Sequence, residues 1–284
     1  MSKPKHFLDT TVARSMLVGT SAYRAYFSRE FGTERLYVSP FVKMEFRRSF
    51  ILALISFYSV LDMEHIRTVE DAFTFWSNEF KTSRLKAVLQ FAGKMFATEK
   101  LSFSNPADKP KALLAVGRII KRINAHFSVF TDIGINSPRC ARANVPLNIE
   151  LSRLWADLKS FADKFTDVET CRSNCTVDTF LLNKHAGKIR KYIQIANGLK
   201  SEKTTDGFKK IAENLKQIEQ KGSSACSCNR CEKIGDAIIA MDTLPDYILE
   251  HTDFSYNNLC ELIGQPHRLH PSETAVIRSS AAST

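Results

Sequence analysis

The sequence predicts an α/β fold, with a small parallel sheet flanked by helices and a large all-helical insertion. Short apolar segments alternate with helical periodicity near both ends of the chain, and this order of elements is typical of a parallel sheet. Between these two regions only amphipathic helical patterns occur. We therefore expect three parts: a core made of residues 1–65 and 232–275, an insertion at 66–231, and a polar tail at 276–284.

The N-terminal elements begin with an apolar triplet, residues 6–8, that is followed by an acid at Asp9 before helical periodicity starts. A second helical stretch precedes the apolar segment 36–38, which is the next expected strand. Ser39 stands directly before a proline, a pattern typical of a helix start. Serine accepts a bond from an unpaired backbone amide, and proline has no amide to lose there. A long helix is therefore expected over residues 40–61.

The C-terminal elements repeat this alternation. A helix is expected over residues 232–244, and a buried strand follows it at 247–252. Asp253 stands at the end of that strand, and Gly264 closes the next helix. A last short strand is expected at 267–269.

Four acidic residues are expected to meet at the carboxyl edge of this sheet. Asp9 and Asp253 follow strands, while Glu45 and Asp236 lie near the starts of helices that follow or face that edge. Four carboxylates at one edge repel one another, and a divalent cation that prefers oxygen ligands is the usual reason to gather them. For Glu45, a solvated glutamate among neighbouring basic residues is the alternative.

Four segments resemble, in order, the successive motifs of the PIN domain, a metal-dependent nuclease fold. They are FLDTT near the N-terminus, SPFVKMEF about thirty residues later, GDAIIA on a late helix, and HTDFSYNNL after a strand. The resemblance covers about residues 4–62 and 232–270. It implies an acidic pocket that binds Mg²⁺ or Mn²⁺ and hydrolyses phosphodiester bonds in RNA. The residues that match the catalytic and metal-binding acids of the family are Asp9, Glu45, Asp236 and Asp253.

The resemblance also has a clear departure. Glu45 and Asp236 are 191 residues apart, whereas the second and third acids of PIN domains are usually separated by a few tens of residues. Loop-closure cost grows slowly with length, so such an insertion is tolerable, but it leaves the substrate class more open than the chemistry. Two alternatives remain: a catalytically silent scaffold that binds nucleic acid or protein, and a structure-specific DNA nuclease of related fold.

The charge of the chain favours an anionic partner, and nucleic acid is the first expectation. The formal net charge is +10 and the pI is near 9.3. Residues 66–231 hold 28 Lys+Arg against 16 Asp+Glu, so the excess falls on the expected insertion. Individual basic residues are more often solvated than in contact with a ligand. The residues predicted to bind substrate are Thr10, Thr11, Arg47, Lys184, Lys188 and Lys191.

Two pairs of cysteines predict a structural zinc ion at the end of the insertion. Cys228 and Cys231 have the C-x2-C spacing that lets two thiolates share one tetrahedral Zn²⁺, and Cys171 and Cys175 would supply the other pair. Ordinary reduced thiols are an equally weighted alternative.

The remaining expectations concern location and partners. The longest apolar run, residues 50–61, is twelve residues with two serines, whereas a membrane-spanning helix needs roughly 20 residues. The N-terminal residues lack the apolar stretch of a signal peptide. We therefore expect a cytoplasmic protein with no membrane association. The resemblance leaves open a protein inhibitor and the pairing of two chains as a homodimer.

Overall fold

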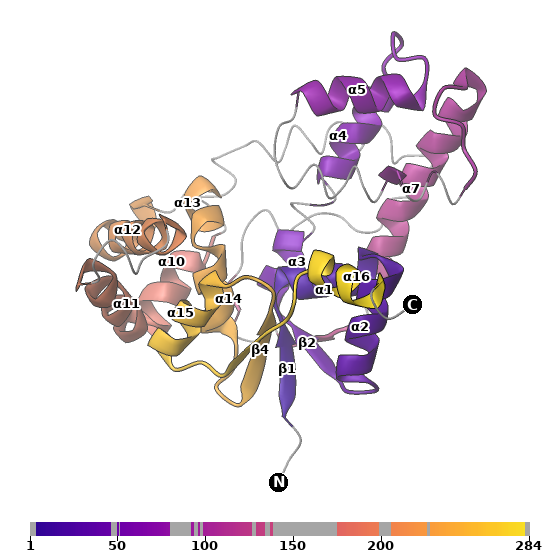
Figure 1. Cartoon of the computed structure of the whole chain (residues 1–284). Coiled ribbons are helices and arrows are strands. Elements are labelled where there is room, and N and C mark those ends of the chain that lie inside the picture. Colours follow the sequence, from indigo (N-terminus) through magenta and orange to yellow (C-terminus); the bar gives the residue numbers. More distant parts are fainter. Residues whose placement is uncertain are drawn as a thin grey trace. The chain divides into compact units, whose positions relative to one another are not determined.

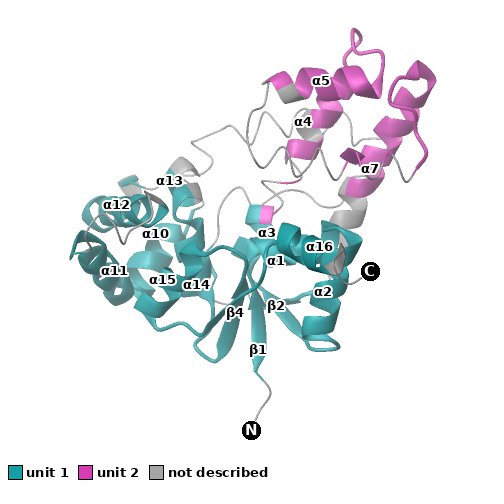
Figure 2. Ribbon diagram, in the orientation of Figure 1, with its two compact units in different colours: residues 1–45, 130–144, 168–284 teal, residues 46–129, 145–167 magenta. Residues whose placement is uncertain are grey.

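The computed structural model describes residues 4–46, 50, 52–79, 92–93, 96, 99–126, 129–133, 137–138, 175–198, 206–225 and 228–281. The chain divides into two compact units (Figure 2). Unit 1 consists of residues 1–45, 130–144 and 168–284, and unit 2 of residues 46–129 and 145–167.

Unit 1 contains a parallel five-stranded sheet in the order β3-β2-β1-β4-β5 (Figure 1). This confirms the predicted α/β class with a small parallel sheet. The central strand β1 pairs with β2 on one side and β4 on the other, so that His6 stands opposite both Leu36 and Ile248. The strands are β1 (Lys5–Leu8), β2 (Leu36–Val38), β3 (Thr131–Asp132), β4 (Tyr247–His251) and β5 (His267–Leu269).

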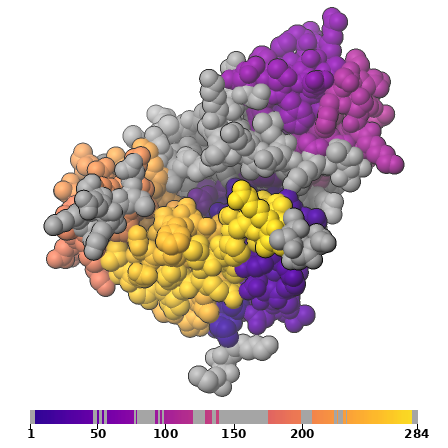
Figure 3. Space-filling view, in the orientation of Figure 1, coloured from indigo at the N-terminus to yellow at the C-terminus, as the bar shows by residue number. Residues whose placement is uncertain are grey.

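Helices flank this sheet (Figure 1). The sheet core is apolar, with Phe7, Val38 and Leu249 fully buried, as expected for parallel strands that are covered on both faces. Figure 3 shows that the C-terminal part of the chain, drawn in yellow, covers much of one face of unit 1. The helices next to the strands in sequence are α1 (Thr10–Val18), α2 (Ser21–Phe31), α3 (Pro40–Phe46), α14 (Gly235–Asp242), α15 (Ser255–Ile263) and α16 (Glu273–Ala281).

A buried ionic network around Glu250 of β4 links three strands of the sheet. The Glu250 side chain is fully buried and its Oε1 lies 2.6 Å from His6 Nδ1 of β1. Its Oε2 accepts hydrogen bonds from Arg268 Nε of β5 at 2.8 Å and from His270 Nε2 at 2.7 Å. Burial by itself would raise the pKa of Glu250, but these three hydrogen bonds outweigh it and hold the pKa below its usual value.

Unit 1 also contains helices from the expected insertion. Helix α11 packs against α12 and α15, and α10 packs against η7. The contacts of the chain therefore divide it differently from the expected boundaries, because residues from 168 to 231 group with the sheet. These elements are α10 (Val177–Thr179), η5 (Phe180–Lys184), α11 (Ala186–Gly198), α12 (Asp206–Lys221), η7 (Gly222–Ala225) and α13 (Cys228–Lys233).

The described part of unit 2 is helical. Helix α4 (Leu52–Leu61) packs against α5 (Val69–Glu79) and α7 (Lys109–His126), and η2 (Pro106–Asp108) precedes α7. Phe57 lies in an aromatic core, with ring centroids 5.3 Å from Trp76 and 6.2 Å from Phe96. Among the helices described in either unit, none combines the length and the apolar character needed to cross a membrane.

Two details differ from the sequence-based expectations. Strand β3 lies inside the stretch predicted to be all helix, because two residues are too short for any periodicity to mark them. The expected helix over 40–61 is described as α3 and α4, and residues 47–49 and 51 between them lie outside the description. Most of the expected polar tail belongs to helix α16, which packs against α2 and buries Val276.

The positive charge is also distributed differently from the expectation. Unit 1 holds 24 Lys+Arg against 19 Asp+Glu, and unit 2 holds 16 against 11. Each unit therefore carries an excess of five positive charges. The cationic excess is not confined to a part of the chain separate from the sheet.

Candidate functional site

Asp9 connects strand β1 to helix α1. Its backbone amide donates to Glu250 O at 3.0 Å, which extends the β1–β4 pairing, and its Oδ1 accepts from the Val12 amide at 2.6 Å as the N-cap of α1. The side chain is buried. Burial raises the pKa of Asp9 well above its usual value, and the carboxylates of Asp236 and Glu45 raise it further, while the Val12 amide acts in the opposite direction.

Glu45 lies on α3 and faces the start of α14. Thr10 Oγ1 donates a hydrogen bond to Glu45 Oε2. The other oxygen, Oε1, lies 2.7 Å from the point where a β-carbon on Gly235 would stand. Helix α3 itself begins at the predicted serine cap, since Ser39 Oγ accepts from the Val42 amide at 3.2 Å.

Asp236 occupies the first turn of α14 beside these groups. Burial raises its pKa to about 7, and the charges of Glu45 and Asp253 contribute in the same direction. The hydroxyls of Tyr256 and Ser255 lower this pKa. Ser255 Oγ is buried and has no hydrogen-bond partner among the described atoms.

Asp253 follows β4 and is exposed. Its Oδ1 accepts from the Ser255 amide at 2.9 Å, and its backbone carbonyl accepts from His251 Nδ1 at 2.9 Å. These two bonds fix the turn that leads into α15. The repulsion with Asp236 places Asp253 in the same electrostatic neighbourhood as the other acids.

The four predicted acids therefore act on one another at the carboxyl edge of the sheet, and we call them the acidic cluster: Asp9, Glu45, Asp236 and Asp253. Their donors are carboxylate oxygens, which suit Mg²⁺ or Mn²⁺. A cation there would relieve the repulsion that raises the pKa values of Asp9 and Asp236. Within the described ranges, no three His, Cys, Asp or Glu side chains already have the geometry of a metal site.

The residues predicted to bind substrate have different surroundings. Thr10 is engaged with Glu45, and Thr11, the next residue of α1, is half-buried. Lys184 and Lys191 are exposed. Lys188 is half-buried, and burial lowers the pKa of its ammonium. Arg47 lies outside the described residues.

The predicted zinc ligands are described only in part. Cys171 and the side chain of Cys228 lie outside the description. Cys175 is half-buried and Cys231 is buried, and neither is joined in a disulfide. Helix α10, which begins two residues after Cys175, contacts η7, which leads toward α13. The two cysteine segments therefore reach the same part of unit 1, and the zinc site stays a prediction.

Sequence reasoning missed one group beside the acids and one buried acid at the far end of α14. Tyr256 is buried, and its hydroxyl lowers the pKa of Asp236; its position three residues after Asp253, at the start of α15, was an available signal. Asp242 at the end of α14 is also buried, and Ser137 Oγ lies 2.9 and 2.8 Å from its two carboxylate oxygens. Burial raises the pKa of Asp242 to about 6.

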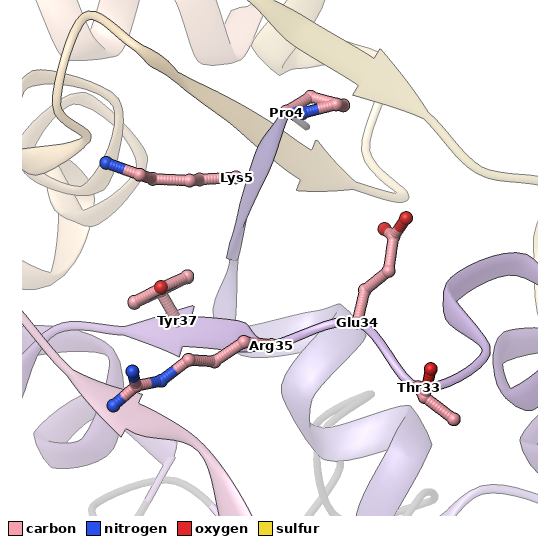
Figure 4. Close-up of a pocket in the computed structure, with 6 residues that line it drawn as sticks. All are labelled: Pro4, Lys5, Thr33, Glu34, Arg35 and Tyr37. Carbon is pink, nitrogen blue, oxygen red and sulfur yellow. The ribbon is translucent and has the colours of Figure 1, made fainter. Parts of the chain in front are cut away.

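A pocket of about 310 Å³ lies at the opposite, amino edge of the sheet (Figure 4). Its two cations are engaged with neighbours outside it. Lys5 Nζ pairs with Asp246 at 3.0 Å, and Arg35 Nε donates to Thr131 Oγ1 at 2.7 Å. This pocket shares no residue with the acidic cluster. It is lined by Pro4, Lys5, Thr33, Glu34, Arg35 and Tyr37.

Comparison of the chain with protein-family models, with curated proteins and with solved structures finds no match.

Proposed function

We propose that this chain is a divalent-metal-dependent ribonuclease that hydrolyses phosphodiester bonds at the acidic cluster. The observation that carries the proposal is the convergence of three acids: Thr10, which follows Asp9, bonds to Glu45, and Glu45 Oε1 faces Gly235, which precedes Asp236. The carboxylates of Glu45 and Asp253 oppose ionisation of Asp236. Repulsive carboxylates destabilise a fold unless a ligand compensates for them, so perturbed acids at one edge favour a functional site.

Asp9, Glu45 and Asp236 would hold the primary Mg²⁺ or Mn²⁺ ion, and Asp253 would hold a second, weaker ion or orient water. A bound divalent ion at such a site supplies an activated water and neutralises charge on the scissile phosphate. No side chain of the cluster needs to act as a covalent nucleophile.

The neighbouring residues of the chain orient these carboxylates. The Val12 amide fixes one oxygen of Asp9, and the Thr10 hydroxyl fixes one oxygen of Glu45. The buried Tyr256 hydroxyl lies close enough to Asp236 to lower its pKa. Each bond leaves further carboxylate lone pairs for a cation, because an ionised carboxylate accepts about four hydrogen bonds or ligand contacts.

The substrate class is inferred from charge and from the resemblance of the motifs. An excess of positive charge in unit 1 favours an anionic partner such as a nucleic acid. On α11, exposed Lys191 and half-buried Lys188 belong to the same unit as the acids, and Lys184 lies just before that helix. RNA is proposed in preference to DNA from the resemblance of the motifs.

A cleavage assay tests the proposal. Wild type and the variants Asp9→Asn and Asp236→Asn are incubated with matched RNA and DNA oligonucleotides in Mg²⁺, in Mn²⁺ and in EDTA. Cleavage of RNA by wild type should need the metal. In both variants, cleavage of RNA should fall by more than the roughly 10- to 100-fold that is typical of removing an outer-shell partner of a metal. Both variants should still bind the oligonucleotide.

The matched control is Asp246→Asn, which removes an exposed acid paired with Lys5 at the amino edge. It should cleave RNA as wild type does. Undiminished cleavage by both cluster variants, or cleavage by wild type in EDTA, would refute the assignment of the site. Faster cleavage of DNA than RNA would change the substrate class and leave the chemistry standing.

A further inference from the structure

The turn between β4 and α15 presents an aromatic side chain to solvent directly after a residue of the acidic cluster. Phe254 follows Asp253, and 72% of its surface is exposed, which is the largest value for any large apolar side chain in the described part of the chain. Single exposed apolar side chains are common on protein surfaces, but this ring stands where a ligand of the acidic cluster would reach it.

The backbone around Phe254 is well bonded. The Tyr256 amide donates to Asp253 O at 3.2 Å, and the Asn257 amide donates to Phe254 O at 3.2 Å. Together with the bond from the Ser255 amide to Asp253 Oδ1, these contacts hold the backbone of the turn that carries the ring. The turn therefore does not need to order its backbone when a ligand binds, which reduces the entropic cost of binding.

The burial pattern of α15 explains why the Phe254 ring is exposed to solvent. The helix buries Tyr256, Leu259, Cys260 and Ile263, which lie at the i, i+3, i+4 and i+7 positions of one face. Phe254 precedes the first of these by two residues and falls off that face. Packing of the helix therefore does not account for an aromatic residue at this position.

The neighbouring site defines the ligand class. If the acidic cluster acts on a phosphodiester bond, as proposed above, the nucleotides on either side of that bond lie within reach of the adjacent turn. Aromatic side chains stack on bases that are unpaired, whereas the bases of a duplex are already stacked and shielded. We propose that Phe254 is a stacking platform for a nucleobase, which makes a single strand the preferred substrate.

The chemistry of the ring also sets the specificity. Phenylalanine has no donor or acceptor with which to read a base edge, and every base has a π-face. Phe254 therefore selects unpaired strands over duplexes with little discrimination between bases. This inference rests on the proposed function for the position of the strand, although the stacking itself needs no metal.

The test is a binding measurement in EDTA, where no cleavage interferes. The probes are a ten-nucleotide oligouridine strand, the same strand annealed to its complement, and a strand of equal length without bases. Wild type should bind the single strand more tightly than the other two. Phe254→Ala should weaken that binding by about 10-fold, within the range that stacking of one base supplies.

Two further substitutions separate stacking from general apolar contact. Phe254→Trp should bind as tightly as wild type, and binding of the oligouridine should change its tryptophan fluorescence. Phe254→Leu should behave as Phe254→Ala, because leucine keeps apolar area but has no π-face. The control Ile277→Ala removes another exposed apolar side chain, on α16, and should change nothing.

The inference is overturned if Phe254→Ala binds the single strand as wild type does, in which case the ring is a contact for a protein partner. It is also overturned if Phe254→Leu binds the single strand as tightly as wild type does. A third contrary result is that each variant loses affinity for the strand without bases by the same factor as for the oligouridine. Stacking without any metal-dependent cleavage would refute the proposed function alone.

Discussion

Glu45 Oε1 lies 2.7 Å from the point where a β-carbon on Gly235 would stand. Real β-carbons do not approach oxygen atoms so closely, so Glu45 occupies its present place because residue 235 has no side chain. The lack of a β-carbon at Gly235 on α14 therefore helps to set the position of the Glu45 carboxylate on α3.

Gly235→Ala should displace the Glu45 carboxylate and weaken metal binding by roughly 10- to 100-fold, as loss of an orienting contact does. The fold should be retained, because the clash involves the end of a flexible side chain and alanine favours a helix more than glycine does. Calorimetric titration with Mn²⁺ measures the affinity. The control is Gly207→Ala in α12, where nothing lies near the added carbon; equal affinities for the two variants would contradict this role of Gly235.

Asp236→Asn should stabilise the protein in the absence of metal. Burial and the neighbouring charges of Glu45 and Asp253 oppose ionisation of Asp236, so its neutral replacement removes a cost on the order of 4 kcal/mol at pH 8. Urea unfolding in EDTA measures the free energy of unfolding. Added Mg²⁺ should then stabilise wild type more than the variant. A variant that is less stable than wild type in EDTA would show that the carboxylate is not repelled there.

Part of this arrangement could be predicted from the sequence, and the reasons are physical. Asp9 and Asp253 each follow an apolar segment, and the ends of parallel strands share an edge, so both could be placed without coordinates. The effect of the Tyr256 hydroxyl on Asp236 could not be predicted, because it depends on how α15 packs against α14. Strand β3 escaped prediction because pairing with β2, and not local periodicity, defines it.

The division of the chain was harder to predict for a related reason. Helical periodicity shows that residues 186–198 form an amphipathic helix but does not show which surface its apolar face covers. In the structure this helix, α11, packs against α15 beside the sheet. Contacts between distant segments decide such groupings, and amphipathic patterns from one chain contain no information about them.

Glu250→Gln should destabilise the fold by about 3 kcal/mol, because removing one partner of a buried ionic network leaves the others uncompensated. The fully buried Glu250 contacts His6, Arg268 and His270, so the loss affects three strands at once. Urea unfolding at pH 7 provides the measurement. Asp246→Asn, which breaks an exposed pair with Lys5, should cost less than about 1 kcal/mol. Equal costs for the two substitutions would show that the Glu250 network contributes no more than a surface pair.

Because Asp242 titrates, the free energy of unfolding should decrease as the pH rises from about 4 to 6. Burial raises the pKa of Asp242 to about 6 in the folded state, although Ser137, Ser39 and Lys184 partly oppose this and Asp132 reinforces it. The unfolded chain releases the same proton near pH 3.9. Between these values the folded state binds more protons, so its stability is greatest at the acidic end of the window and is lost toward neutral pH.

Asp242→Asn should remove this dependence. The amide stays neutral and can still exchange hydrogen bonds with Ser137, so the difference in unfolding free energy between variant and wild type should grow by about 2 kcal/mol from pH 4 to pH 7. Urea unfolding of both proteins at several pH values, in EDTA, gives this difference directly, and other titrating groups cancel because both proteins contain them. A constant difference across the range would mean that Asp242 titrates at its ordinary pKa in the folded protein, as an exposed carboxylate would.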